Sequence, residues 1–307
     1  MTDFKANLQG IIAMCAAMAG IILNDACVKT VSESGLPTGE IIFVRGLIAF
    51  SFITVLALRF GLRSDFPRLF DRRIGWRTLG EVAGTAFYLT ALFQMAIGPV
   101  TAILQALPLM ITAGAAIFLR EKVGLHRWAA VLVGFAGVLI IMRPGLEGFD
   151  ATGLLVVISM LFIALRDLVT RTLPAIVSSY SITWCAALGV CLLGFAMLPL
   201  EDWTMPTGYQ FGMMVVASIF LLIGYFGSIA AMRIGEISAV SPFRYTIVVW
   251  ALLLGYFIWG EVPDLPTLIG TAIIVAMGVY TVFRERRTAR RAMRAVSHPA
   301  APGPISE

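Results

Sequence analysis

Long runs of hydrophobic residues fill most of this chain, and short polar stretches separate them. The runs with few or no charged residues predict ten membrane-spanning helices, at about 8–29, 38–59, 75–96, 100–119, 126–142, 151–170, 178–199, 208–231, 238–259 and 265–283. Each run approaches the roughly 20 apolar residues that a helix needs to cross the hydrocarbon core of a bilayer. Residues 82–119 carry no charge and are too long for one crossing, so the sequence predicts a turn at Gly98-Pro99 between two helices.

The composition favours the same fold class. Of the 307 residues, 59% are hydrophobic and 13% are charged, whereas a soluble domain carries about 25% charged residues. We therefore expect an all-α polytopic membrane protein without a separate soluble domain. The four cysteines lie within apolar runs and show no CxxC spacing, so they indicate neither a disulfide framework nor a zinc site.

The basic residues indicate how the chain is oriented. If the N-terminus is cytoplasmic, that side receives the basic residues of 59–77 and 120–127 and the arginine-rich tail, whereas the opposite side receives Lys29 and Arg143. Cytoplasmic loops of membrane proteins carry an excess of Lys and Arg, so both termini are predicted to be cytoplasmic. The net charge of +5 is then explained by topology, and nucleic acid is not an expected partner.

Self-comparison of the sequence reveals two halves. Residues 23–30 resemble residues 165–172 at an offset of 142, residues 95–103 resemble 232–240 at an offset of 137, and Arg120-Glu121 resembles Gly260-Glu261. These matches predict a first five-helix repeat at 1–147, a second at 148–284, and a basic, then Pro-rich tail at 285–307. The end of this tail, beyond Arg294, is expected to lack fixed structure.

The odd number of spans in each half predicts that the repeat is inverted. With five spans per half, equivalent segments enter the membrane from opposite sides, so Asp25 and Asp167 lie near opposite surfaces. Inverted repeats are typical of secondary transporters, in which a solute site near the midplane opens alternately to each side. The alternative is that the duplication only builds a stable helix bundle.

Several motifs in these segments also carry a family resemblance. They are Asn24-Asp25-x3-Lys29, Glu40-x4-Arg45, Asp167-x3-Arg171, and Ser241-Pro242-Phe243-Arg244-Tyr245 followed by Gly260-Glu261-Val262-Pro263-Asp264. The chain resembles the drug/metabolite transporter superfamily, EamA type, and within it the S-adenosylmethionine and riboflavin transporter-like branch. The resemblance covers nearly the whole chain. It implies ten spans in two inverted repeats and the transport of a small metabolite, but it does not specify the solute.

Two arginines within predicted spans are candidates for solute binding. An ion at the bilayer centre costs at least about 2.5–3.5 kcal/mol, so it needs a partner or a water-filled cavity. Arg45 and Arg244 are each suited to bind a carboxylate or phosphate group of a solute. The alternative is that each pairs with Asp25, Glu81 or Asp167 and only holds helices together.

Asp25 and Asp167 are candidates for gating or coupling. Each precedes a basic residue by four positions, Lys29 and Arg171, which is also the spacing of a local ion pair on a helix. A local pair is the alternative interpretation, and it is the favoured one. Glu121 and Glu261 follow predicted spans, so we interpret them as mainly structural.

Neutral polar side chains supply the remaining candidates for a solute site. They are Tyr88, Gln94, Gln105, Trp184 and Tyr245. Tyr88 and Gln94 are six positions apart and do not share one face of a helix.

These features together predict a secondary transporter of a bacterial-type inner membrane. The best-supported solute is amino-acid-like or S-adenosylmethionine-like, and the alternative is riboflavin uptake. A membrane-embedded enzyme is a further alternative, but the two histidines are isolated and no nucleotide-binding motif occurs. The expected partners are a small-molecule solute and the lipid bilayer, with no cofactor or metal, and the sequence sets no oligomeric state.

Overall fold

The computed structural model describes residues 2–60, 62–121, 123–143, 152–173 and 177–297, and within these ranges the ordered elements are all helical. In chain order they are α1 (Thr2–Glu33), α2 (Thr38–Arg59), α3 (Leu62–Asp65), η1 (Phe66–Phe70), α4 (Arg72–Gln94), α5 (Ile97–Leu104), α6 (Leu107–Phe118), α7 (Leu125–Met142), α8 (Thr152–Arg171), α9 (Ser179–Met197), η2 (Leu198–Leu200), α10 (Gly208–Ile234), α11 (Ile237–Val240), η3 (Ser241–Tyr245), α12 (Thr246–Trp259) and α13 (Leu265–Ser297). The Pro-rich end of the predicted tail, 298–307, lies outside the described residues.

The predicted spans and the observed helices agree closely. Within the described residues, nine helical segments are long and apolar enough to cross a membrane. The tenth predicted span corresponds to α4, which has the length of a span but carries four charged residues in its first half. The last helix continues past its predicted end through the basic residues to Ser297, because Ala and Arg are strong helix formers.

The predicted turn between the third and fourth spans is displaced by a few residues. The chain turns at Met95-Ala96, and Gly98-Pro99 lie in the first turn of α5. Proline is tolerated there because the first helical N–H groups have no intrahelical partner. The expectation that Gly98-Pro99 forms the turn was therefore wrong, although the two-helix interpretation of 82–119 is confirmed.

The helix after this turn is interrupted, and so is its counterpart in the second half. The break between α5 and α6 falls at Gln105-Ala106, before Pro108, and the second break is the 3-10 segment η3, which contains Pro242. Proline removes one backbone hydrogen bond and crowds the preceding turn. Interrupted helices within a membrane occur where the freed backbone groups face protein or water rather than lipid.

The long helices pack in four extended pairs, and the small residues lie at their contacts. α1 lies along α10, α4 along α8, α2 along α9, and α7 along α13. A Cβ on Gly20 of α1 would stand 3.1 Å from a backbone oxygen of α10, and a Cβ on Gly80 of α4 would stand 2.8 Å from the carbonyl oxygen of Phe162 in α8. Gly80 and Gly84, four positions apart, thus allow α4 to approach α8 closely.

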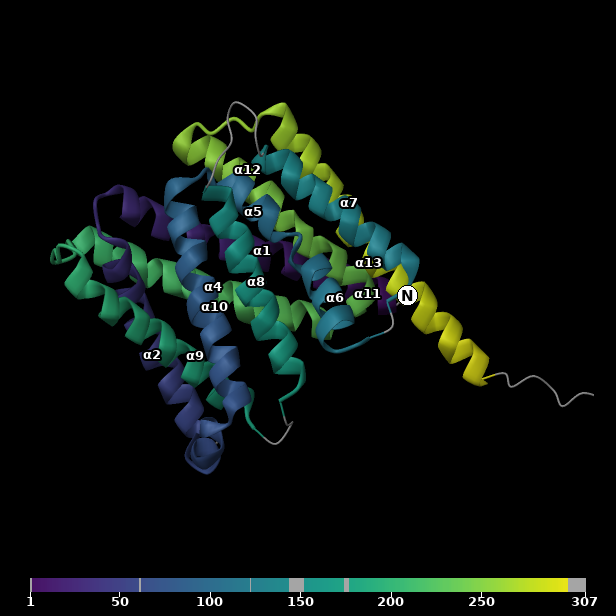
Figure 1. The fold of residues 1–307 in the computed structure, drawn as a ribbon, viewed down its shortest axis with the longest axis horizontal. Helices are drawn as coiled ribbons and strands as arrows, with labels where there is room; N and C mark the ends of the chain where they lie inside the picture. The colour runs from purple at the N-terminus through teal and green to yellow at the C-terminus, as the bar shows by residue number, and fades with distance from the viewer. Residues whose placement is uncertain (1, 61, 122, 144–151, 174–176, 298–307) are drawn as a thin grey trace, which may run out of the picture.

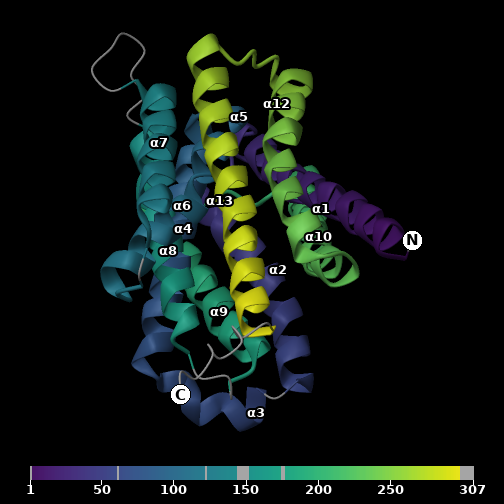
Figure 2. The same ribbon diagram turned by 90° about the vertical axis from the view of Figure 1, so that its right-hand side faces the viewer.

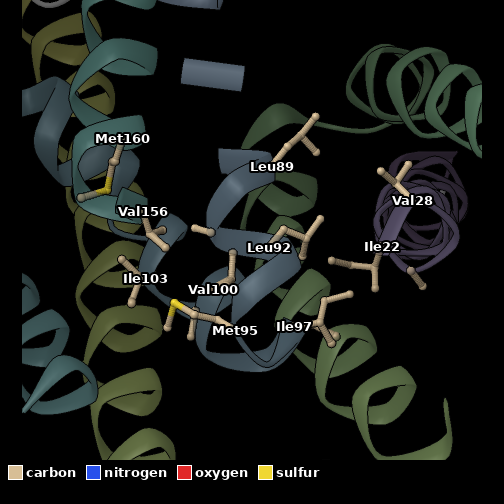
Figure 3. Close-up of a cluster of buried hydrophobic side chains, with 14 of the residues drawn as sticks. Ile22, Val28, Leu89, Leu92, Met95, Ile97, Val100, Ile103, Val156 and Met160 are labelled. Carbon is tan, nitrogen blue, oxygen red and sulfur yellow. The ribbon is translucent and has the colours of Figure 1, made fainter. Parts of the chain in front are cut away.

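The core lies where α4 and α5 pass between the two halves. Figure 3 shows Leu89, Leu92 and Val100 between α1 on one side, with Ile22 and Val28, and α8 on the other. All of these side chains are buried. The segment around the turn at Met95 therefore contacts both halves of the chain.

The loops divide between two ends of the bundle. In Figure 1 the connections after α1, α4, α9 and α12 lie at the upper left, and we call this the Lys29 end. The C-terminal ends of α2, α6 and α8 lie toward the bottom and centre right, and we call this the Arg171 end. Figure 2 shows the second view, with α3 at the bottom and the loop between α12 and α13 at the top.

Candidate functional site

A polar cluster joins α1, α2 and α4 inside the bundle. Asp25 of α1 is 5% exposed. Its carboxylate accepts hydrogen bonds from the Tyr88 hydroxyl, at 2.6 Å, and from the Asn24 side-chain amide, at 2.8 Å. Arg45 of α2 is close enough to interact electrostatically with both Asp25 and Tyr88. The three helices thus bring one negative and one positive group together within predicted spans.

Asn24 leaves one acceptor unused in this cluster. The residue is 1% exposed, and its side-chain oxygen has no hydrogen-bond partner among the described residues. An unsatisfied buried polar group costs about 1–3 kcal/mol. A donor group of a bound molecule would remove this cost, which makes the cluster a candidate binding site.

Two of the predicted site residues pack against protein instead. Trp184 of α9 donates its ring N–H to the Thr54 hydroxyl of α2 at 3.0 Å, and its ring lies 5.5 Å from that of Phe50. Tyr245 is buried in η3, and its hydroxyl occupies the space beside Gly278 of α13. Both side chains therefore have partners that hold helices together.

Among the described residues, the remaining candidates make no hydrogen bond or ion pair with the cluster. Gln94 is exposed at the end of α4, Gln105 is partly buried at the break between α5 and α6, and Arg244 is exposed in η3. The structure thus brings together Asp25, Arg45 and Tyr88, and leaves the other candidates elsewhere.

Asp167 belongs to a different kind of cluster. It accepts a hydrogen bond from Arg166 at 2.8 Å, and Arg166 also pairs with Glu81 of α4 at 3.1 Å. Arg77 extends this chain of charges, at 3.5 Å from Glu81. The alternating charges tie α8 to α4, so Asp167 has fixed partners within the protein.

The two predicted local ion pairs do not form. Lys29 donates to Glu261 at 3.0 Å and to the Met95 carbonyl oxygen at 2.6 Å, rather than to Asp25. Its ammonium also lies 4.9 Å from the centre of the Trp259 ring. These contacts together outweigh one local pair, because they combine a buried ion pair with a cation–π contact. The expectation of a local pair with Asp25 was therefore wrong.

In the second half the equivalent pair is also absent. Arg171 lies 3.7 Å from Glu121, and Asp167 is bound to Arg166 instead. Sequence analysis did not identify the roles of Asn24 and Glu261, although both stand in motifs that it singled out. Among the described residues, no three His, Cys, Asp or Glu side chains gather where a metal ion would be held.

Comparison with known proteins shows which proteins this chain resembles. Residues 151–284 match the EamA-like transporter family. The chain is 29% identical over 290 residues to a riboflavin transporter of Vibrio cholerae, which covers 92% of this chain and 96% of the relative. Through residues 151–284, this chain is similar to the EamA-like transporter family. The match and its relatives point to a transporter rather than an enzyme, and to a multi-pass membrane protein.

Other relatives of this chain carry a second name. It is 25% identical over 202 residues to an S-adenosylmethionine uptake transporter of Rickettsia felis, which covers 65% of this chain and 68% of the relative. A protein of known crystal structure has the same fold, with a TM-score of 0.59 and 20% identity over 90% of this chain and 98% of that one.

Proposed function

We propose that this protein is a secondary transporter that moves a small organic solute by alternating access, with Asp25, Arg45 and Tyr88 at its solute site. The observation that carries the proposal is the polar cluster itself. It places a carboxylate and a guanidinium within membrane-spanning helices, where polar groups are costly and are usually functional.

The packing of the helices supports an inverted repeat, whose predicted boundary at 147/148 lies outside the described residues. The pairs α1–α10 and α8–α4 correspond when the first five spans are exchanged with the last five. The same exchange replaces α2 by α9 and α7 by α13, so each of these two pairs is mapped onto itself. The interrupted fourth span occurs in both halves, as expected where discontinuous helices flank a transport site.

The distribution of charge supports an orientation with both termini in the cytoplasm of a bacterial-type inner membrane. The Arg171 end carries most of the basic residues, and the N-terminus and the arginine-rich end of α13 lie on the right of Figure 1, away from the Lys29 end. Under the positive-inside rule the Arg171 end faces the cytoplasm.

The charges of the cluster favour a zwitterionic, amino-acid-like solute, of which S-adenosylmethionine is an example. Arg45 is suited to a carboxylate, and Asp25 is suited to a cationic group. The unused Asn24 oxygen offers an acceptor for a further N–H or O–H group. A site with one cation and one anion is suited to bind both the carboxylate and the ammonium group of an amino acid.

Riboflavin is the second candidate, and the lengths of the matches favour it. The relative named as a riboflavin transporter in Vibrio cholerae matches over 92% of this chain, whereas the S-adenosylmethionine relative in Rickettsia felis matches over 65%. Riboflavin has no carboxylate, so it would use the hydrogen-bonding groups of the site rather than its charges.

Uptake into proteoliposomes tests both candidates. Purified protein is reconstituted, and the uptake of radiolabelled S-adenosylmethionine and of riboflavin is measured for the native chain, Arg45→Ala and Arg244→Ala. We expect uptake of S-adenosylmethionine that falls at least about tenfold in Arg45→Ala, which corresponds to about 1.4 kcal/mol, and that persists in Arg244→Ala, whose side chain is exposed.

The alternatives give different results. Uptake of riboflavin without S-adenosylmethionine would overturn the zwitterion assignment and favour the second candidate. Uptake that is equal in Arg45→Ala and the native chain would place the solute site elsewhere. A thermal-shift measurement with each compound checks binding independently, because a ligand that binds the native state raises the melting temperature.

A further inference from the structure

Two ion pairs link the halves of the chain at opposite ends of the bundle. Lys29, near the end of α1, pairs with Glu261, which follows α12, and the Nζ–Oε1 distance is 3.0 Å. Arg171, at the end of α8, faces Glu121, which follows α6, at 3.7 Å. Lys29 matches Arg171 in the sequence repeat, and Glu261 matches Glu121. The two pairs are therefore the same interaction with the halves exchanged.

The backbone supports this equivalence independently of the sequence match. The residue before each glutamate has a positive φ, 67° before Glu261 and 54° before Glu121. Each glutamate N–H then donates to the carbonyl oxygen six residues earlier, Gly255 at 3.0 Å and Ala115 at 3.2 Å. This is the same helix-ending turn in both halves. At position 120 the turn is formed by an arginine, although positive φ is uncommon for residues other than glycine.

The two pairs differ sharply in how far their side chains are exposed. The side chains of Lys29 and Glu261 are 6% and 21% exposed, whereas those of Arg171 and Glu121 are 53% and 50% exposed. The first pair has further bonds, since Lys29 donates to the Met95 carbonyl oxygen and Glu261 accepts the Ile97 N–H at 3.0 Å. It therefore ties α1, the turn between α4 and α5, and the end of α12 into one contact.

We propose that the Lys29–Glu261 and Arg171–Glu121 pairs are the two alternating gates of this transporter, the first short and buried and the second longer and exposed in this structure. The proposal rests on the proposed function. Because the pairs are related by exchange of the halves, a rearrangement in which the halves exchange conformations buries one pair as it exposes the other. Each pair then moves between a buried and an exposed position, and no cation is left unpaired in the bilayer.

The arrangement of the helices agrees with this assignment. In Figure 1 the ends of α2, α4, α8 and α9 near Arg171 point downward, while the start of α1 and the end of α13 point to the right. At the Arg171 end these elements thus point in two different directions. With both termini in the cytoplasm, the structure is inward-facing.

Distances between spin labels at the two ends test the proposal without knowledge of the solute. A variant free of the four native cysteines receives labels either at Ser32 and Val262, across the Lys29 end, or at Phe118 and Thr170, across the Arg171 end. Double electron–electron resonance is then recorded in lipid nanodiscs. The parent chain is expected to give a short, narrow distance distribution at the first pair and a broader one at the second.

Neutralising one gate should change the distances at the two ends in opposite directions. Glu261→Gln weakens the buried gate, so we expect longer Ser32–Val262 distances and shorter Phe118–Thr170 distances. Glu121→Gln weakens the exposed gate, so we expect the inward-facing distances to persist and the outward-facing fraction to fall. Arg143→Gln removes a different cation at the Lys29 end and serves as the matched control, with both distributions unchanged.

The outcomes separate this inference from the proposed function. In Glu261→Gln, the distance distributions could broaden at both ends, or the distances could lengthen at both ends. Either result would mean that the pair only stabilises the fold, and would overturn the gate assignment. If adding S-adenosylmethionine or riboflavin shifts the distances in the parent chain, but the Glu261→Gln substitution does not, the proposed function stands and the gate assignment is overturned. Opposite shifts in Glu261→Gln without uptake of either compound would support the gates and contradict the proposed solutes.

Discussion

The two halves of this chain place a matching aspartate in opposite surroundings. Asp25 in α1 is bound by neutral donors, Tyr88 and Asn24, and lies near a cation from another helix. Asp167 in α8 is bound directly by Arg166 within a network of ion pairs. The same position in the repeat thus serves two purposes. One aspartate is left with interactions that a solute can join, and the other is committed to the packing of two helices.

The tyrosines of the two halves show the same division. Tyr88 of α4 donates to Asp25. Its counterpart at an offset of 137 is Tyr225 of α10, which is 55% exposed and contacts Phe226. Of these two tyrosines, Tyr88 donates a hydrogen bond to the aspartate of its half, whereas Tyr225 is exposed.

Neutralising the two aspartates should break this comparison most strongly. Asp25→Asn keeps the shape of the side chain but removes the negative charge to which Tyr88 and Asn24 donate, and each hydrogen bond to a charged group is worth about 1.5–3 kcal/mol. We expect transport, measured as initial uptake into proteoliposomes, to fall at least about 30-fold. Asp167→Asn is the matched control, and a change of less than about threefold is expected because its surroundings are partly exposed. Equal losses would contradict the division of roles.

The tyrosines give a smaller effect. Tyr88→Phe removes one hydrogen bond to a charged group, which is worth about 1.5–3 kcal/mol. We expect a decrease of about tenfold in uptake, with the protein still folded by thermal denaturation. Tyr225→Phe removes an exposed hydroxyl and should leave uptake unchanged. If the two variants behave alike, the Tyr88–Asp25 bond has no part in transport.

The sequence predicts the positions of the helices better than the contacts between their side chains. The charge-free runs locate the helices because a membrane span must be long and apolar, and that requirement is visible locally. Ion pairs such as Lys29 with Glu261 join residues 232 positions apart. Local spacing instead favours Asp25 as the partner of Lys29, so the correct partner could only be found from the packing.

The candidate site shows the same limit. Arg45, Tyr88 and Asp25 stand out as polar residues in apolar runs, and the structure brings these three together. Trp184 stands out in the same way but donates to Thr54 at a contact between helices. Cavity lining and interhelical bonding require the same residue types in the same apolar context, so sequence alone does not separate them.

The ion-pair network around Asp167 should contribute to stability rather than transport. Glu81→Gln leaves Arg77 and Arg166 facing each other without the carboxylate between them. Because these side chains are about one quarter exposed or less, we expect a loss of about 1–3 kcal/mol, below that of a fully buried pair. Thermal denaturation in detergent measures it. Arg68→Gln, which removes an exposed partner of Asp65, should change the melting temperature far less.

The smallest expected effect concerns a contact between the two halves, from the end of α7 to the residue before α13. Arg143 donates to Asp264 there, and hydrogen bonds from Arg143 and then Thr267 lower the pKa of Asp264 from 3.8 to about 2. A lowered pKa in the folded state stabilises the protein above about pH 4, and this contribution is lost as the pH falls toward about 2. Asp264 is half exposed, so Arg143→Gln should cost less than about 1 kcal/mol near neutral pH. It should also reduce the loss of stability between about pH 4 and about pH 2, because the pKa of Asp264 returns toward its ordinary value. Melting temperatures of the two proteins across this range check the prediction, and parallel curves would show that the contact does not set the titration of Asp264.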